Sequence, residues 1–382
     1  LVDSNIIRNT FNWNKIGLEG ISTIYNILAK NNIELSSGMV DNVLKPKNKL
    51  RFNVNFLEKA YAEILSDEPD YGSFEIKFID KDTDKVMDWA TVKTNHYRKI
   101  EIGYYVNWRI LITNLDNNEI VFQHDLELEN KRVYVSIESS SLGDNIAWMP
   151  QIEAFRKKHN CHVIVSTFKN ILFEGEYPDL EFISPGMVAD NIIAHYRIGW
   201  FYKDNNEFNE FRNPQNFREI PLQQAASDIL GLEYKQLHSP IRHLDRGRPI
   251  KDKYVCIGMH GTAQSKYWNN YKGWQEVVDY FKNKGFKVVL LSTERDGYMG
   301  NKHPKGITNV RGSLNQAVNY LHYAEMFVGI GSGLSWLAWG VGVPLVLVSG
   351  FSMPYSEFEG DNIRRVFNKN VCNGCFNKFR LD

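Results

Sequence analysis

The carboxylate of Asp144 lies between a segment that reads as a strand and a segment that reads as a helix. The run RVYVSIE, residues 132–138, reads as a strand, and a helical pattern through Ile146 and Phe155 begins just after Gly143 and Asp144. Two interpretations of Asp144 are open. It could cap the helix, because free N–H groups and the helix dipole stabilise a negative charge there. It could also act as a general base that takes a proton from an acceptor hydroxyl.

A second polar segment, HGTAQSKYWNN, follows the strand-like run YVCIGMH. It offers Thr262, Gln264 and Lys266 just beyond the end of that strand. A hydroxyl and an ammonium group can bind the oxygens of a diphosphate, with lysine acting as a point charge. A solvated loop without a ligand explains the segment equally well.

The third segment is GIGSGLSWLAWG, residues 329–340, in which a strand runs through glycines into a helix. Such a turn presents backbone N–H groups to an anion. It lacks both the dinucleotide-binding pattern with its later acidic residue and the P-loop pattern. We predict that the turn binds a substrate phosphate through Gly331, Ser332, Gly333, Leu334 and Ser335.

Strands and helices alternate from residue 132 onward, which predicts a layered α/β protein. A joint containing Pro and Arg, residues 239–253, divides this part into two Rossmann-like domains, 132–245 and 246–382. Ligands of open α/β sheets bind beyond the carboxyl ends of the strands. We therefore expect the carboxylate, on the first domain, to face the two anion-binding loops, on the second, across a cleft.

Two further segments precede the α/β part. Residues 1–72 are expected to be helical, and FLEKAYAEIL, which begins at Phe56, fits a helix face. Residues 73–131 alternate apolar and polar side chains around polar turns, which predicts a small antiparallel β domain.

The amino-acid composition argues against nucleic acid and membrane as partners. The 382 residues carry 45 basic and 45 acidic side chains, so no overall positive charge attracts nucleic acid. The apolar runs are too short to span a bilayer. Four cysteines in a chain of this length do not form the framework of a small secreted domain, which favours a cytoplasmic protein.

Four segments together resemble a known family. SLGDNIAWMP, HGTAQSKYWNN, GIGSGLSWLAWG and VCNGC are similar, in order and separation, to motifs of bacterial autotransporter heptosyltransferases. Those enzymes resemble lipopolysaccharide heptosyltransferases and have the GT-B fold, with two Rossmann-like domains facing a cleft. The resemblance covers residues 74–382.

The resemblance implies inverting transfer of a heptose from ADP-heptose to a protein Ser hydroxyl. It implies that Asp144 is the base, that Lys266 binds the donor diphosphate, and that Thr262 and residues 332–335 help to hold the phosphates. It implies no cofactor for the transfer step. Since the family includes ring assemblies, a homo-oligomer is also expected.

The family further carries a metal finger with two CxxC pairs, usually binding iron. Cys372 and Cys375 match the first pair, and the sequence stops at Asp382 before a second. A tetrahedral thiolate site needs four ligands, and Cys161 and Cys256 lie in strand-like runs. We expect a partial metal knuckle for iron or zinc, with a redox CxxC as the alternative.

Other functions and other residues stay open. A nucleotide-sugar epimerase or hydrolase would share the fold, and a non-catalytic protein-binding subunit would tolerate loss of Asp144. Ser352, Glu357 and Phe358 follow a strand and fit either a nucleotide pocket or a structural loop. We interpret Trp336 and Trp339 as packing residues and His260 as a hydrogen-bonded residue at a strand end.

Overall fold

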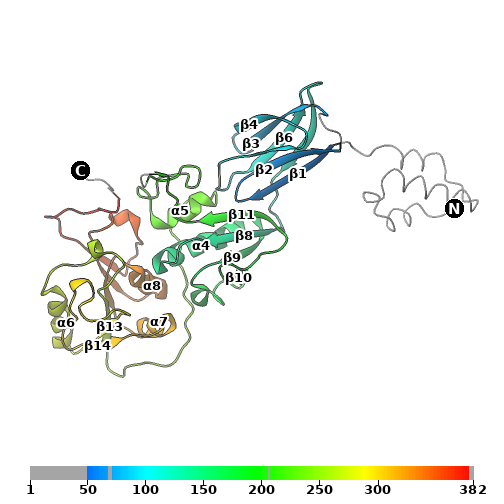
Figure 1. Cartoon of the computed structure of the whole chain (residues 1–382). Helices are drawn as coiled ribbons and strands as arrows, with labels where there is room; N and C mark the ends of the chain where they lie inside the picture. Colours follow the sequence, from blue (N-terminus) through cyan, green and yellow to red (C-terminus); the bar gives the residue numbers. More distant parts are fainter. Residues whose placement is uncertain (1–49, 68–70, 205–206, 378–382) are drawn as a thin grey trace, which may run out of the picture.

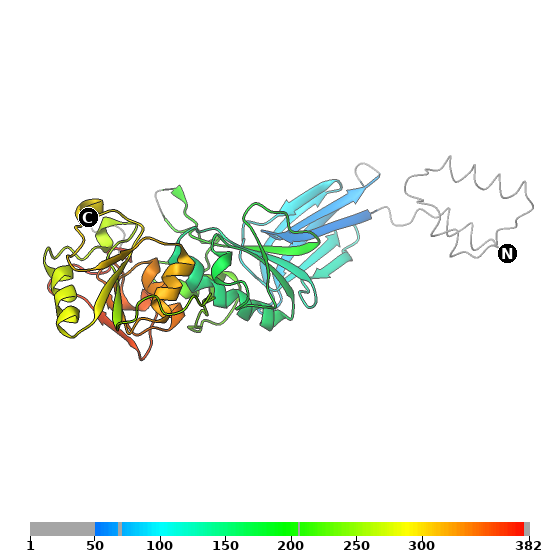
Figure 2. The same cartoon turned by 90° about the horizontal axis from the view of Figure 1, so that it is seen from below.

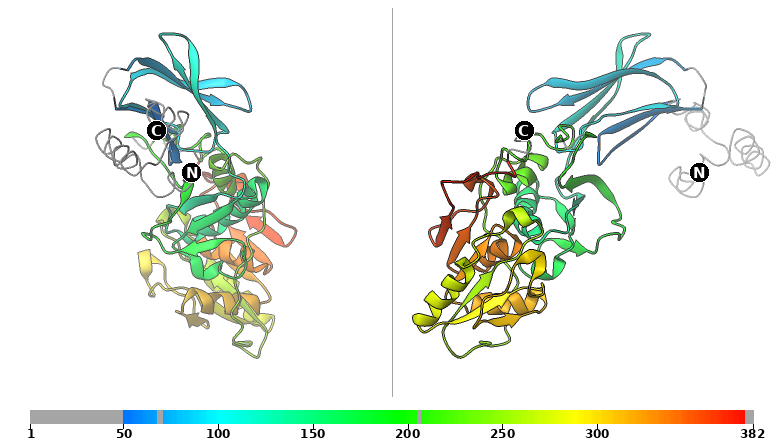
Figure 3. Two further views of the ribbon diagram at one scale, coloured as in Figure 1. Left: turned by 90° about the vertical axis from the view of Figure 1, so that its right-hand side faces the viewer. Right: turned by 60° about the vertical axis from the view of Figure 1, so that its left-hand side comes forward.

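The computed structural model describes residues 50–67, 71–204 and 207–377. Strands β1 to β7 lie at one end of an elongated molecule, and the C-terminal sheet with its helices lies at the other (Figures 1 and 2). A central α/β layer around β8 and α4 joins the two (Figure 3). The helices expected before residue 50 lie outside the described residues.

The central layer is a mixed sheet of seven strands. Four of them form a parallel core: β8 (Arg132–Ile137), β9 (His162–Ser166), β10 (Glu181–Ile183) and β11 (Ile192–Ile198). Beyond β11 the sheet continues through β1 (Leu50–Leu57), β2 (Tyr61–Ser66) and β5 (His96–Lys99). The helices α4 (Leu142–His159) and α5 (Leu222–Ile229) pack on each other.

The prediction of a helix in FLEKAYAEIL is wrong. Its residues form the end of β1 and most of β2, separated by Glu58, whose φ of 67° breaks the strand. Along β2 every second side chain is buried, with Ala62 and Ile64 fully covered. Burial with a period of two is typical of a strand. The backbone of β1 is hydrogen-bonded to β11, so the segment forms part of a sheet instead of a helix.

A separate antiparallel sheet of four strands covers this end of the molecule. Its order is β4 (Lys85–Lys93), β3 (Ser73–Asp80), β6 (Trp108–Asn114) and β7 (Glu119–Asp125). The alternation noted in the sequence therefore matches strands. However, β5 belongs to the central sheet, where it pairs with β2. Residues 73–131 therefore do not form a single β sheet, and the domain boundaries stay predictions.

The C-terminal half is a parallel sheet of six strands. Their order is β14 (Thr308–Val310), β13 (Lys287–Leu291), β12 (Tyr254–Gly258), β15 (Phe327–Ile330), β16 (Leu345–Val348) and β17 (Ile363–Val366). The α-helices of this half are α6 (Gly273–Asn283), α7 (Leu314–His322) and α8 (Gly333–Val341). Short 3₁₀ turns are η1 (Asn170–Leu172), η3 (Gln264–Lys266), η4 (Tyr298–Gly300) and η5 (Pro354–Ser356). The alternation of strands and helices predicted for the α/β part is confirmed.

The two halves meet where α4 and α8 begin. A β-carbon on Gly143 would lie 2.9 Å from Cδ1 of Trp336, and one on Gly333 would lie 2.8 Å from Cβ of Leu142. Glycine at both positions thus lets the first turns of the two helices come into contact. Within the described ranges, no helix combines the length and hydrophobicity needed to cross a membrane.

Candidate active site

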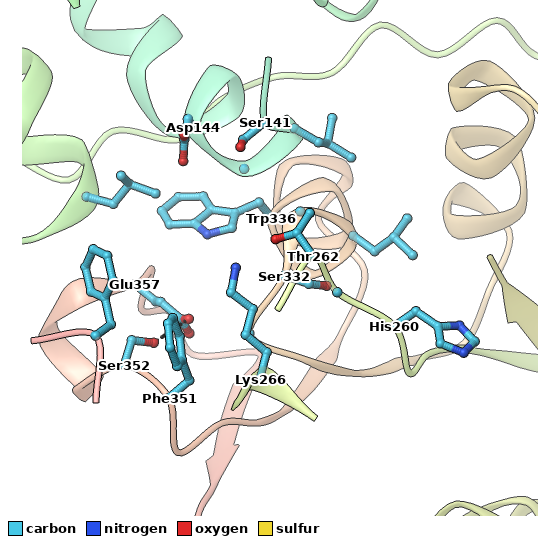
Figure 4. Close-up of a pocket in the computed structure, with 18 of the residues that line it drawn as sticks. Ser141, Asp144, His260, Thr262, Lys266, Ser332, Trp336, Phe351, Ser352 and Glu357 are labelled. Carbon is cyan, nitrogen blue, oxygen red and sulfur yellow. Dashed lines mark hydrogen bonds between the residues drawn. The ribbon is translucent and has the colours of Figure 1, made fainter. Parts of the chain in front are cut away.

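One cavity of about 340 Å³ opens at this junction and is lined by both halves (Figure 4). The N-terminal half contributes the start of α4 and the residues that follow β11, and the C-terminal half contributes the loops after β12, β13, β15 and β16. Seven residues predicted from the sequence line it: Asp144, Thr262, Lys266, Gly331, Ser332, Gly333 and Leu334. The structure therefore brings the expected carboxylate and both anion-binding loops together.

Asp144 is the third residue of α4, and the N-cap position belongs to Ser141. The capping alternative is therefore wrong in its simple form, although Asp144 remains in the first helical turn. Its Oδ2 accepts a hydrogen bond from Ser139 Oγ at 2.6 Å and another from Trp200 Nε1 at 2.8 Å. Two donors on one oxygen fix the orientation of the carboxylate.

Burial raises the pKa of Asp144 above the usual aspartate range. The Ser139 and Trp200 hydrogen bonds, the positive charge of Lys266 and the Ser141 hydroxyl act in the opposite direction. A carboxylate that is partly desolvated is a stronger base than one in water. This environment suits a group that must accept a proton from a hydroxyl.

The loop after β12 supplies the cation. Lys266 ends the short turn η3, and its ammonium group points toward the middle of the cavity from below Asp144 (Figure 4). Its Nζ lies 5.5 Å from the ring centroid of Phe351. Thr262 also lines the cavity, whereas Gln264 does not and instead donates to the carbonyl of Met299. The loop thus presents a hydroxyl and a positive charge together.

The turn into α8 is the second element predicted to bind an anion. Ser332 occupies the N-cap position without a side-chain cap, and its buried Oγ has no hydrogen-bond partner among the described residues. The first N–H groups of a helix have no partners within the helix, so the start of α8 offers free donors toward the cavity.

Ser335 does not belong to this set. Its side chain is buried and its Oγ donates to the carbonyl of Ile330 at 2.6 Å. Ser335 is the third residue of α8, and its side chain points back to the preceding strand instead of into the cavity.

The loop after β16 adds an acidic group. Glu357 lines the cavity, accepts from Ser352 Oγ at 2.7 Å and pairs with Arg365 at 2.9 Å. Phe358, the third residue considered in this loop, packs instead against Trp336 at a centroid distance of 4.8 Å. Trp336 is buried, as expected of a packing residue, yet it also forms part of the cavity wall.

Several lining residues were not predicted from the sequence to belong to the site. Trp200 follows β11, Ser292 and Glu294 follow β13, and Phe376 comes from the C-terminal segment. The positions of Trp200, Ser292 and Glu294 just after strands could have indicated that they line the site, because parallel strands bring their carboxyl ends to one edge of the sheet. His260, considered as a hydrogen-bonded strand-end residue, forms the expected bond through Nδ1 to Ser292 Oγ at 2.8 Å.

The described residues do not complete the expected metal site. Cys372 and Cys375 are free and exposed. Across residues 50–67, 71–204 and 207–377, no group of three or more His, Cys, Asp or Glu side chains could hold a metal. The pair could provide no more than two of the four ligands that a tetrahedral thiolate site needs. Cys161 and Cys256 are buried, as expected of core residues.

The family follows from comparison with known proteins. Residues 187–377 match the family model Glycosyltransferase family 9 (heptosyltransferase). Aah of Escherichia coli, described as an autotransporter heptosyltransferase, is 35% identical over 313 residues, covering 80% of this chain and 78% of Aah. The chain belongs to the autotransporter heptosyltransferase family. It is therefore a glycosyltransferase, as the resemblance of the motifs predicted.

A solved member of this family has the same fold. TibC of enterotoxigenic E. coli, described as an iron-containing dodecameric glycosyltransferase, matches with a TM-score of 0.77 and 30% identity, covering 87% of this chain and 85% of TibC. A second TibC structure is described as a complex with ADP-D-beta-D-heptose. BimC of Burkholderia thailandensis, 29% identical over 67% of this chain and 61% of BimC, is described as an inactive autotransporter heptosyltransferase.

Proposed function

We propose that this heptosyltransferase moves a heptose from ADP-heptose to a Ser hydroxyl of a protein, with inversion at the anomeric carbon. The observation that carries the proposal is the meeting of Asp144 with Lys266 and the start of α8 in one cavity. A base on one half and an anion-binding surface on the other are what transfer from a nucleotide sugar requires. The description of TibC with ADP-heptose supports the choice of donor.

In the proposed reaction, Asp144 removes the proton of the acceptor hydroxyl as its oxygen bonds to the anomeric carbon. The bond from that carbon to the β-phosphate oxygen breaks on the opposite face, and ADP leaves with the electron pair. Lys266, Thr262 and the N–H groups at the start of α8 stabilise the negative charge that grows on the diphosphate. These fixed charges and dipoles do for the leaving group what a divalent ion does in other transferases.

The remaining parts of the cavity divide between nucleoside and sugar. His260 lies on the side of the cavity away from Glu357 (Figure 4). Ser292 hydrogen-bonds to His260 and to the backbone N–H of Glu294, and both residues also line the cavity. Hydroxyl and carboxylate groups there can hydrogen-bond ribose hydroxyls. Ser352 and Glu357 lie on the other side of Lys266 (Figure 4), where they can bind hydroxyls of the sugar.

A protein acceptor, a cytoplasmic location and an assembled state belong to the same proposal. The first rests on the description of the relatives as autotransporter heptosyltransferases. The second rests on four free cysteines in an enzyme that uses a nucleotide sugar. TibC is described as dodecameric and iron-containing, which supports a multisubunit form and a structural metal held in part by Cys372 and Cys375.

The proposal is tested by incubating the protein with a panel of nucleotide sugars and an autotransporter passenger domain. Intact-mass spectrometry should show one heptose added per modified site and an equal release of ADP. ADP release without mass gain would instead indicate hydrolysis, and donor isomerisation without release would indicate an epimerase. Digestion and fragmentation of the product would then locate the sugar on Ser or elsewhere.

A further inference from the structure

The carboxylate of Asp144 is tied to a different strand through an indole. Ser139 reaches Oδ2 from the same loop, five residues earlier, but Trp200 reaches the same oxygen from the residues that follow β11. The indole N–H lies 2.8 Å from Oδ2 and has the geometry of a hydrogen bond. Hydrogen bonds to ionised acceptors are the stronger class.

The indole itself is held by aromatic rings on several sides. Phe217 meets it edge-on at a centroid distance of 4.8 Å, and Trp148 lies at 5.6 Å. Phe376 meets it at 5.8 Å with an interplanar angle of 80°. Edge-to-face contacts have a preferred geometry, so these rings restrict rotation of the Trp200 side chain.

Phe376 is anchored to both halves of the molecule. Its backbone N–H donates to the carbonyl of Phe351 at 2.9 Å, on the C-terminal half. Its carbonyl accepts from Arg218 at 3.4 Å, and the Arg218 guanidinium lies over the Phe376 ring at 5.9 Å from the centroid. The next residue, Asn377, donates to the carbonyl of Arg218 and to Ser356 Oγ. The contact between Phe376 and Trp200 therefore depends on the two halves being together.

We propose that Trp200 is a positioning residue for the base. Its N–H holds Oδ2 of Asp144 so that the second carboxylate oxygen faces the acceptor hydroxyl, and Phe376 keeps the indole in place when the halves are closed. The inference rests on the proposed role of Asp144. A tryptophan that serves only as packing would contribute to stability without any effect on proton transfer.

Trp200→Phe tests the proposal because it keeps a ring in the aromatic cluster and removes the N–H. A general base contributes about 10²–10⁴ in rate, and we expect loss of its positioning to lower kcat by about tenfold. KM for the donor should change by less than about twofold, because the donor contacts stay in place. The acid limb of the pH profile of kcat/KM should move to higher pH, since the variant no longer stabilises the carboxylate form.

Trp148→Phe is the matched control. Trp148 is a buried tryptophan of the same cluster whose N–H donates to the backbone carbonyl of Leu222 at 2.8 Å. That variant should lose stability and keep the acid limb of the wild-type enzyme. If Trp200→Phe loses stability alone, with an unmoved acid limb and an unchanged kcat, the positioning role is wrong.

Two further variants keep the test valid if Trp200→Phe does not fold. Ser139→Ala removes the other donor to Oδ2 and should move the acid limb in the same direction. Phe376→Leu leaves the indole N–H intact but loosens its support, so its kcat should fall between those of the wild type and Trp200→Phe. An acid limb unchanged in Ser139→Ala, or a wild-type kcat in Phe376→Leu, would contradict the scheme.

Failure of this inference differs from failure of the proposed function. If the wild-type enzyme transfers no heptose from ADP-heptose, the proposed function fails. If it transfers heptose and the Trp200→Phe profile is superimposable on that of the wild type, only the positioning role fails.

Discussion

Gly143 lies directly against Trp336 at the junction of the two halves, where a β-carbon would approach the indole Cδ1 to 2.9 Å. The residue beside Gly143 is the candidate base, and Trp336 forms a wall of the cavity. Packing between the first turns of α4 and α8 therefore sets the distance between Asp144 and the donor-binding surface.

Gly143→Ala should separate the two helices. Inserting a methyl group into a packed contact costs about 1–3 kcal/mol, and the displacement should lower kcat more than it changes ADP affinity. Chemical denaturation and steady-state kinetics measure the two effects. Gly261→Ala is the control for stability, because its β-carbon would meet only ordinary contacts at 3.4 Å. Equal stability of the two variants would show that the junction is looser than the structure indicates.

The pH dependence follows from the burial of Asp144. Because burial raises its pKa, the acid limb of kcat/KM should lie at higher pH than the titration of an ordinary aspartate. In the folded protein the Asp144 carboxyl keeps its proton at pH values at which the same carboxyl in the unfolded chain is already ionised. Its ionisation therefore destabilises the fold as pH rises through the folded pKa.

The same reasoning predicts a stability gain in Asp144→Asn. At neutral pH the amide avoids burying a charge, so the melting temperature should exceed that of the wild type. At acidic pH, where the wild-type carboxyl is protonated, the difference should shrink. Differential scanning calorimetry across the pH range measures this trend. A gap that widens toward acidic pH would mean that the folded state favours the carboxylate.

Lys266→Ala tests the diphosphate contact. Hydrogen bonds to charged groups contribute about 1.5–3 kcal/mol, so ADP affinity should fall by roughly tenfold or more and transfer should slow with it. Adenosine, which has no phosphate, should bind the variant as it binds the wild type. Lys272→Ala, in the same loop region but outside the cavity lining, should bind ADP normally. Isothermal titration calorimetry gives all three comparisons, and undiminished ADP affinity in Lys266→Ala would remove the lysine from the site.

The sequence predicted the site better than it predicted the N-terminal strands. Asp144, Thr262 and Lys266 follow apolar strands of two α/β domains, and ligands bind beyond the carboxyl ends of such strands, so their meeting across a cleft could be anticipated. Ser335 was misjudged because the direction of its side chain, which donates to the carbonyl of Ile330, depends on contacts that the sequence does not show.

Residues 56–65 show the opposite case. Their apolar spacing fits a helix face, but the segment pairs with β11 and with its own neighbour to extend the central sheet. Partners more than a hundred residues away decide the outcome, and local periodicity does not report them. The roles of Trp200 and Phe376 were missed for the same reason, since the contacts of Trp200 with Asp144 and with Phe376 join distant parts of the chain.

The most direct test of the account compares transfer with donor binding in Asp144→Asn. The variant should lose about 10²–10⁴ in heptose transfer to the acceptor protein, measured by intact-mass spectrometry, while binding ADP with wild-type affinity. Asp228→Asn is the control, because Asp228 lies in α5 and does not line the cavity. This variant should retain full transfer. Transfer at the wild-type rate by Asp144→Asn would contradict the assignment of the base.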